Sequence, residues 1–171
     1  DSATSLLIHC NGADGSTTFT DSSPSPKTVT ANGNAQIDTA QSQFGGASGL
    51  FDGTGDYLST ADSAEHDFGS GDFTIDGWVR FPGALGGGYT IASKYASLIG
   101  WIFSVTPNAE MRLYHSGSGS VAVAVSLAAD TWYHLAVVRS GSNIMFFKDG
   151  VQQGTSQSAN ATYNGAAAGL A

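Results

Sequence analysis

Apolar and polar residues alternate with a period of two along most of the chain, which places successive side chains on opposite faces of extended strands. The clearest example is residues 73–81, whose odd-numbered positions are apolar or glycine and whose even-numbered positions are Thr74, Asp76, Trp78 and Arg80. Because both faces carry aromatic rings, we expect this strand to lie between two packed layers, with Trp78 as a core anchor.

The same alternation predicts about a dozen short strands joined by Gly-, Asn- and Ser-rich turns. Asp149-Gly150 is the strongest hairpin signal, because a type I′ turn needs positive φ at both central residues. A second sharp reversal is expected at the Gly-rich turn of residues 52–56. The expected strands cover residues 5–9, 28–31, 35–37, 49–51, 57–59, 73–81, 89–94, 100–105, 111–115, 121–127, 132–139, 143–148 and 151–155.

Helical periodicity is hard to find anywhere, and the composition agrees with an all-β fold. Charged residues make up 12% of the 171 residues, while glycine alone contributes 23 positions. This length fits one domain, so we expect residues 1–171 to form a single β-sandwich. Residues 156–171 lose the strand rhythm, and we expect there a loop or a truncated terminal segment.

The formal net charge of −8, from 14 acidic and 6 basic residues, excludes some partners. Such a surface repels phosphate backbones and no Lys or Arg cluster offsets it, so we expect no nucleic-acid partner. Cys10 is the single cysteine, which excludes an intrachain disulfide. No apolar run approaches the roughly 20 residues of a spanning helix, so we expect no membrane span.

Two stretches carry a resemblance to a known family. The first is FDGTGDYL at residues 51–58 followed by FTIDGWVRF at 73–81, and the second is WYHLAVVR at 132–139 running to FKDGV at 147–151. Together they resemble the laminin-G-like, concanavalin A-like jelly-roll domains of bacterial surface proteins, glycosidase accessory modules and phage tail or head fibres. The opening LLIHCNG at 6–12, with FTDSS at 19–23, is similar to the phage-associated members.

The resemblance implies an all-β fold, a two-sheet antiparallel β-sandwich with jelly-roll connections. Domains of this kind usually end in a strand that carries an acidic pair and pairs with the first strand. Nothing after Gly154 matches that strand, so two alternatives stay open: the sandwich lacks its last strand, or residues outside this sequence supply it. An unpaired edge would be covered by neighbouring chains in an assembly.

Calcium is the cofactor that the resemblance implies. Twelve of the 14 acidic residues are Asp, which is typical both of turns and of loops that hold a hard cation. In similar domains an Asp of the first long loop joins carbonyl oxygens near the Gly-rich turn around one ion. The matching residues here are Asp14 and Asp21 in the loop and Asp52 and Asp56 at the turn.

Three aromatic residues, Tyr95, Trp101 and Tyr114, are candidates for stacking on a sugar ring. The alternative for Trp101 is ordinary packing. Trp132 is expected to be a core anchor like Trp78, and His134 is expected to pack on the opposite face of the same strand.

We expect no catalytic centre. Glycosidases on this scaffold use two carboxyl groups that flank the scissile bond. Glu65 and Glu110 are 45 residues apart, and neither lies in a strand of alternating acids. Asp76 has Trp78 and Arg80, not acidic residues, at the next two positions of its face.

These observations favour a non-catalytic binding or decoration module. We expect it on the virion of a phage, as part of a fibre, tail or head decoration, or on an extracellular bacterial surface, with a glycan or cell-surface receptor as its ligand. Other protein chains of an assembly are further expected partners. The alternatives are a structural module that stabilises a particle without binding sugar, and a truncated glycoside hydrolase domain.

Overall fold

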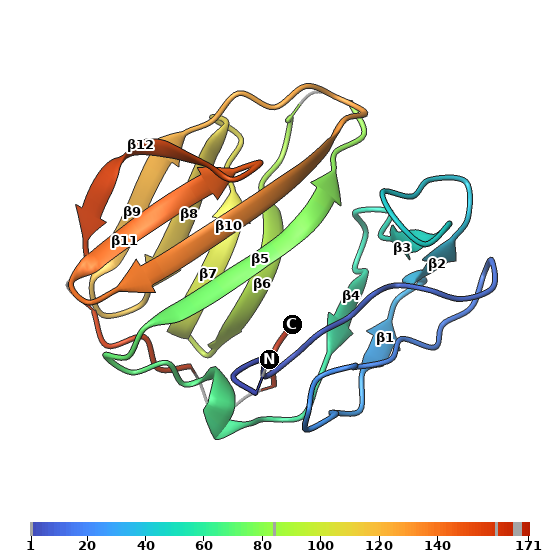
Figure 1. The fold of residues 1–171 in the computed structure, drawn as a ribbon, viewed down its shortest axis with the longest axis horizontal. Coiled ribbons are helices and arrows are strands. Elements are labelled where there is room, and N and C mark those ends of the chain that lie inside the picture. Colours follow the sequence, from blue (N-terminus) through green and yellow to red (C-terminus); the bar gives the residue numbers. More distant parts are fainter. Residues whose placement is uncertain (1, 84, 160, 166–168) are drawn as a thin grey trace. The chain divides into compact units, whose positions relative to one another are not determined.

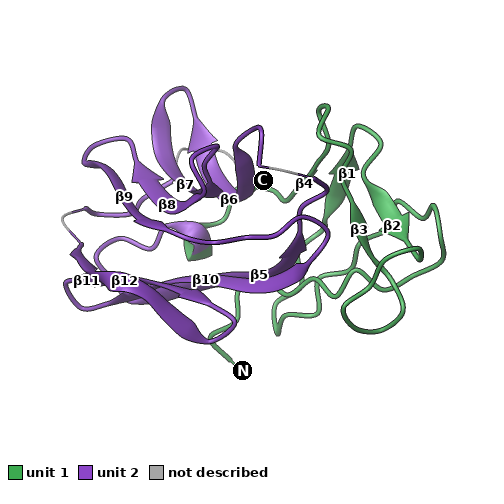
Figure 2. Ribbon diagram, turned by 90° about the horizontal axis from the view of Figure 1, so that it is seen from above, with its two compact units in different colours: residues 1–65, 169–171 green, residues 66–168 purple. Residues whose placement is uncertain are grey.

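The computed structural model describes residues 2–83, 85–159, 161–165 and 169–171, which form β-strands and one three-residue 3₁₀ helix, η1. Two compact units make up the chain: unit one comprises residues 1–65 and 169–171, and unit two residues 66–168 (Figure 2). Among the described residues, no helix is long and apolar enough to cross a bilayer. The elements are β1 (Thr30–Asn32), β2 (Gln36–Asp38), β3 (Ser48–Leu50), β4 (Tyr57–Ser59), η1 (Ala64–His66), β5 (Phe73–Arg80), β6 (Tyr89–Ala96), β7 (Ile99–Val105), β8 (Glu110–His115), β9 (Gly119–Ala124), β10 (Trp132–Ser140), β11 (Asn143–Lys148) and β12 (Val151–Ser158).

Unit two is a sandwich of two four-stranded antiparallel sheets, which Figure 2 shows as two layers. One sheet has the order β12-β11-β10-β5 and the other the order β6-β7-β8-β9. After β5 the chain crosses to the second sheet, runs through its four strands in sequence, and returns to pair β10 with β5 (Figure 1). The predicted two-sheet antiparallel sandwich is confirmed.

The inner faces of the two sheets form the core of unit two. Trp101, Phe103 and Val105 of β7 alternate along one strand and are buried, and so are Leu135 and Val137 of β10. The rings of Phe103 and Phe146 lie with centroids 6.4 Å apart and join the two layers. Burying a side chain of this size contributes about 1.5–3 kcal/mol relative to leaving it in water.

Two buried cations have acceptors inside unit two. Lys94 is 0% exposed, and its Nζ lies 2.9 Å from Asp67 Oδ1, which also accepts the Gly165 N–H at 2.7 Å. Arg139 donates from Nη1 to the carbonyl oxygens of Gly69 and Ala161, both at 3.0 Å. The described residues after β12 therefore close one end of the sandwich through hydrogen bonds to buried cations and their partners.

Unit one holds two short antiparallel pairs, β1 with β4 and β2 with β3, around a small core of Phe19, Ile37 and Ala47. A hairpin at the Gly-rich turn of residues 52–56 would require β3 to pair with β4, but β3 pairs with β2 and β4 pairs with β1. Residues 5–9 do not form the expected strand either, since they contribute only the isolated bridge of Ile8 with Asp21.

The expected hairpin at Asp149-Gly150 is confirmed, with φ of 50° and 78° at the two residues. β12 runs to Ser158, so the strand rhythm extends three residues beyond the expected end at 155. Farther on, Tyr163 forms an isolated bridge with Gly69. Residues 160 and 166–168 of the expected terminal segment lie outside the described residues.

Gly100 in β7 gives a first testable prediction. Its φ is 121°, and a Cβ there would lie 1.9 Å from the carbonyl oxygen of Lys94. We expect Gly100→Ala to lower the free energy of unfolding by about 3 kcal/mol, because the new methyl group would clash with a backbone atom of Lys94, which cannot move aside as a side chain can. Gly77→Ala in β5 is the matched control, since its Cβ would meet nothing within 4 Å. In urea denaturation the control should change stability by less than about 1 kcal/mol, and equal losses in both variants would contradict the interpretation.

Candidate functional site

The structure separates the three aromatic candidates. Trp101 is 1% exposed, its Nε1 donates to the His66 carbonyl oxygen at 3.1 Å, and its ring lies 5.0 Å from that of Phe68. The expectation of Trp101 as an exposed stacking platform is therefore wrong, and packing is its role. It points inward because it alternates with Phe103 and Val105 on the core face of β7.

Tyr95 and Tyr114 lie together on the outward face of the β6-β7-β8-β9 sheet. Tyr114 stands opposite Ile102, whose neighbours Trp101 and Phe103 point into the core, so its ring points outward. The two tyrosine rings meet edge to face with centroids 5.8 Å apart. Both are half-buried, and ligand contact by this pair stays a prediction.

The outward face of the other sheet carries aromatic and polar groups that the sequence analysis placed differently. Trp78 is 41% exposed, so its assignment as a core anchor is wrong. Its ring lies 5.5 Å from the His134 imidazole, its cross-strand partner. His134 Nε2 in turn lies 3.1 Å from Asp76 Oδ1, and both side chains are partly exposed.

Trp132 belongs to the same outward face. It stands opposite Arg80, whose guanidinium forms an ion pair with Asp130 at 2.7 Å, and it is half-buried. His134 shares this face with Trp132, because residues two apart in a strand point the same way, so the expected opposite placement is wrong. We call Asp76, Trp78, Trp132 and His134 the tryptophan face.

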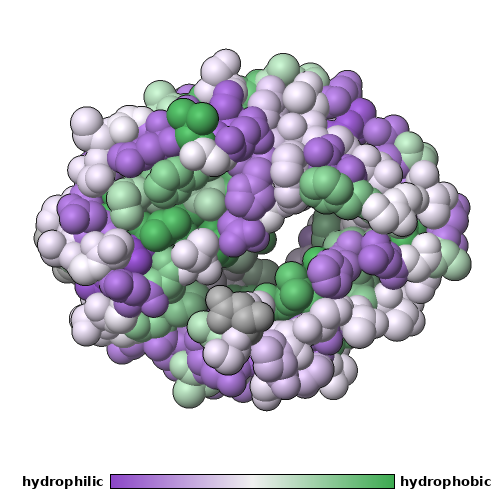
Figure 3. All heavy atoms as spheres, in the orientation of Figure 1, coloured by the Kyte–Doolittle hydropathy of each residue, from purple (hydrophilic) through white to green (hydrophobic). Residues whose placement is uncertain are grey.

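An apolar strip continues the tryptophan face across the sheet. Val138 stands opposite Met145, and Ala136 opposite Phe147, in the pairing of β10 with β11. This face points to the viewer in Figure 1, and Figure 3 shows hydrophobic residues gathered there among hydrophilic ones. An indole beside a carboxylate and an imidazole suits sugar recognition: the ring stacks on the C–H face of a pyranose while the polar groups bind its hydroxyls.

The carboxylates considered for hydrolysis are engaged in other contacts. Glu65 forms an ion pair with Lys27 in unit one, and Glu110 accepts a hydrogen bond from Thr106 Oγ1 at 3.2 Å in unit two. Asp76 pairs with His134 rather than with a second carboxyl group. A glycosidase mechanism of two facing carboxyl groups has no support in these contacts.

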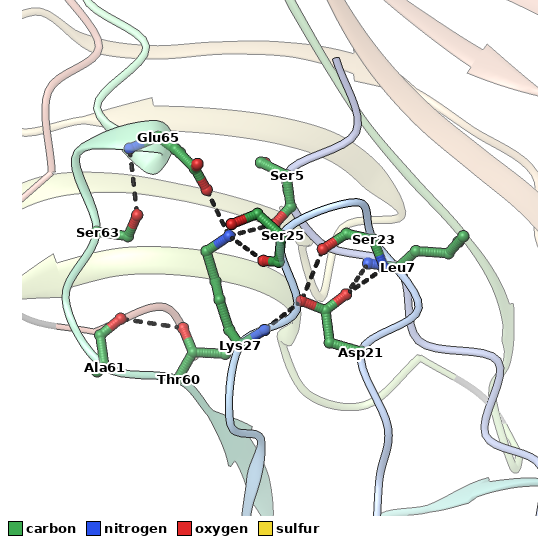
Figure 4. A network of polar contacts seen from close by, with 10 residues as sticks. All are labelled: Ser5, Leu7, Asp21, Ser23, Ser25, Lys27, Thr60, Ala61, Ser63 and Glu65. Carbon is green, nitrogen blue, oxygen red and sulfur yellow. Dashed lines mark hydrogen bonds and ion pairs between the residues drawn. The ribbon is translucent and has the colours of Figure 1, made fainter. Parts of the chain in front are cut away.

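Asp21 organises the first long loop through four hydrogen bonds (Figure 4). Its Oδ1 accepts the backbone N–H groups of Leu7 and Ser23, and its Oδ2 accepts Ser23 Oγ and the Lys27 N–H, all at 2.8–2.9 Å. Burial by itself would raise the pKa of this carboxyl, but the four donors outweigh it and lower the pKa to about 2. With four lone pairs occupied, Asp21 does not fit the role of a calcium ligand.

The other three acidic candidates for calcium also cap turns. Asp14 accepts Thr39 N–H at 3.0 Å, and Asp52 accepts Thr54 N–H at 2.7 Å. Asp56 accepts the N–H groups of Asn34 and Asp52, both at 2.8 Å. Each retains free lone pairs, but the residues that the structure describes contain no group of three or more His, Cys, Asp or Glu placed to hold a metal. Calcium binding by Asp14, Asp52 and Asp56 stays a prediction.

Comparison with known proteins shows a family and a set of similar folds. A family model described as the concanavalin A-like lectin/glucanases superfamily matches residues 52–171. No curated protein matches the sequence.

Solved structures of botulinum neurotoxin binding domains share the fold. One has a TM-score of 0.69 at 13% identity; its description says that cell entry of botulinum neurotoxin type C depends on interaction with two ganglioside molecules. A neurotoxin DC binding domain in complex with SialylT has a TM-score of 0.65 at 15% identity, and the same domain with rat synaptotagmin II has 0.67 at 15%. These matches cover 97–99% of this chain but 42–44% of the neighbours, so the chain spans less than half of their length.

The Asp21 carboxyl predicts an acid-dependent loss of stability. Its pKa is lower in the folded chain, about 2, than the ordinary value of 3.8, so its contribution is complete above about pH 4 and is lost as the pH falls through 2. We expect Asp21→Asn to lower the free energy of unfolding by about 2 kcal/mol at neutral pH, and this difference from wild type to shrink as the pH falls toward 2.

Asp38→Asn is the control for this prediction, because Asp38 accepts a single hydrogen bond, from the Ala40 N–H. Urea denaturation at several pH values is the measurement. A deficit in Asp21→Asn that is independent of pH, or no larger than that of Asp38→Asn, would contradict the assignment.

Calcium binding is tested by thermal melting in calcium and in chelator. The prediction is that calcium raises the melting temperature of the wild-type chain and that Asp52→Asn combined with Asp56→Asn removes the rise, because bound ligand stabilises the folded state. Asp72→Asn in unit two is the control. Equal melting temperatures of the wild type in calcium and chelator would rule the site out.

Proposed function

The chain belongs to the concanavalin A-like lectin/glucanases superfamily, and on this premise we propose that it is a non-catalytic module that binds carbohydrate at a cell surface. The superfamily includes sugar-binding and sugar-cleaving proteins, so the site must distinguish between them. The engaged carboxylates support the binding alternative.

A single observation carries the proposal: the exposed Trp78 indole, flanked by the His134–Asp76 pair, on the outward face of a rigid sheet. Large aromatic side chains are usually buried in soluble proteins, so an exposed indole needs an explanation. An indole fixed on a sheet can stack on a sugar ring without a conformational change of the protein. Asp76 supplies acceptors and His134 a second polar group within the same patch.

The structural neighbours support the same ligand class. Their descriptions name gangliosides, SialylT and synaptotagmin as the molecules that those toxin domains contact. At 13–15% identity the neighbours share the fold, and the ligand class for this chain is our proposal.

The proposed setting is extracellular: the surface of a phage virion, in a fibre, tail or head decoration, or the surface of a bacterium. The net charge of −8 and the Gly- and Ser-rich turns suit a rigid, soluble scaffold presented to solvent. A structural role without sugar binding is the competing function. The apolar strip of Met145 and Phe147 beside the tryptophan face would then contact protein chains of an assembly.

Substitution of Trp78 tests the proposed function on a glycan array followed by calorimetry with the best ligand. We expect Trp78→Ala to weaken glycan binding by about tenfold or more, because stacking on the indole is lost, while Trp78→Phe retains part of the affinity. Both variants should fold, since the ring is exposed.

Tyr57→Ala, which removes an exposed aromatic ring of unit one, is the matched control. An unchanged affinity in Tyr57→Ala with a loss in Trp78→Ala supports binding on the tryptophan face, and equal affinities of Trp78→Ala and wild type would contradict it. No bound glycan on the array, together with a stable oligomer in light scattering, would replace the proposal with the structural role.

A further inference from the structure

Arg112 lies in the middle of the outward face of the β6-β7-β8-β9 sheet. On β8 it alternates with Met111 and Leu113, which are buried in the core, so its side chain points outward. Its cross-strand partners are Ser104 on β7 and Ala122 on β9. Tyr114 follows two residues later on the same face and meets Tyr95.

Among the described residues, Arg112 differs from the other basic residues in having no acceptor. Lys27, Arg80 and Lys94 form ion pairs, and Arg139 and Lys148 donate to backbone carbonyl oxygens. Within the part of the chain that the structure describes, no hydrogen bond or ion pair satisfies the Arg112 guanidinium, and its Nε is buried without a partner. Of the six Lys and Arg side chains, five thus have a partner among the described residues and Arg112 does not.

Ser104 is a second, independent observation that points to a ligand. It is 4% exposed, and its Oγ is buried without a hydrogen-bond partner in the described structure. As the cross-strand partner of Arg112 it projects from the same face of the sheet. A buried polar atom without a partner costs about 1–3 kcal/mol, and two adjacent ones need an explanation.

We propose that Arg112 and Ser104 form a second binding site, on the outward face of the other sheet from the tryptophan face, for the carboxylate or sulfate group of an acidic sugar. A guanidinium offers a planar fork of donors that matches two oxygens of such a group, and the Ser104 hydroxyl supplies one more donor. The Tyr114 and Tyr95 rings form an apolar wall on the same face for the carbon skeleton.

The described acidic residues form no ion pair with Arg112. Glu110, two residues away on β8, accepts a hydrogen bond from Thr106 Oγ1 instead. The protein carries a net charge of −8, which disfavours anions elsewhere on its surface. That the oxyanion is borne by a sugar rests on the proposed function, whereas the oxyanion site itself stands on the unsatisfied donors.

The test uses ¹⁵N-labelled full chain and three probes at constant ionic strength: methyl glucuronide, methyl glucoside and inorganic sulfate. The Arg112 Nε–H signal and the backbone amides of β7 and β8 are followed by NMR, and affinities come from the titrations. We expect the glucuronide to move the Arg112 signal and to bind about tenfold more tightly than the neutral glucoside, because one ionic, forked contact is added.

Four variants complete the design. Arg112→Gln should reduce glucuronide binding to the level of the glucoside, Arg112→Lys should retain part of the preference, and Ser104→Ala should weaken glucuronide binding by a few-fold. Arg80→Gln, which removes the ion-paired arginine of the other sheet, is the control and should leave the preference unchanged. Melting temperatures confirm that each variant is folded.

The outcomes separate this proposal from the proposed function. Sulfate that moves the Arg112 signal while no sugar binds supports the oxyanion site and removes the glycan-binding function. A sugar that binds without moving Arg112, or equal glucuronide affinity in wild type and Arg112→Gln, overturns the oxyanion site and leaves glycan binding on the tryptophan face intact.

Discussion

The packing of the two inner sheet faces in unit two is the constraint on which the rest of that unit depends. Phe103 on one sheet meets Phe146 on the other, and the alternating residues around them are almost completely buried. Since side chains alternate along each strand, burying one set commits the other set to the outward faces. The tryptophan face and the face of Arg112 are therefore consequences of the core, held in place by strands that cannot slip by one residue without exposing it.

The outward faces hold polar groups and aromatic rings side by side. The His134–Asp76 pair and the Arg112 guanidinium carry charge or strong polarity, and beside each lie aromatic rings that water solvates poorly. On an ordinary sheet surface, exposed aromatic residues stand singly among polar residues and are not grouped with charged groups in one patch. Aromatic and polar groups fixed on one rigid surface are what a sugar ring needs, because its two faces differ from its hydroxyl rim in the same way.

Much of this fold is predictable from the sequence because its determinants are local. The alternation over residues 73–81 and the positive-φ pair Asp149-Gly150 each specify their element within a few residues. Pairing in unit one was not predictable, since β4 joins β1 across the chain instead of its neighbour β3, and no local signal distinguishes the two arrangements. The same limit applies to Asp21, whose four donors come from residues as far away as Leu7.

The aromatic residues show why the site was harder to predict than the fold. The sequence predicts Trp78 as a core anchor and offers Trp101 as a stacking candidate, whereas in the structure Trp78 is exposed and Trp101 is buried. The deciding signal was the chemistry of the residues two positions away: Asp76 and Arg80 mark the solvent face of β5, whereas Phe103 marks the core face of β7. For Arg112 no such signal exists, because a lone arginine in a strand is ordinary. Its meaning comes from contrast with Lys94 and Arg139, which the same unit buries and provides with acceptors. Among the described residues, the fold supplies acceptors for the deeply buried Lys94 and Arg139 but none for the half-buried Arg112 guanidinium or the Ser104 hydroxyl opposite it, and this contrast favours a partner from outside the chain.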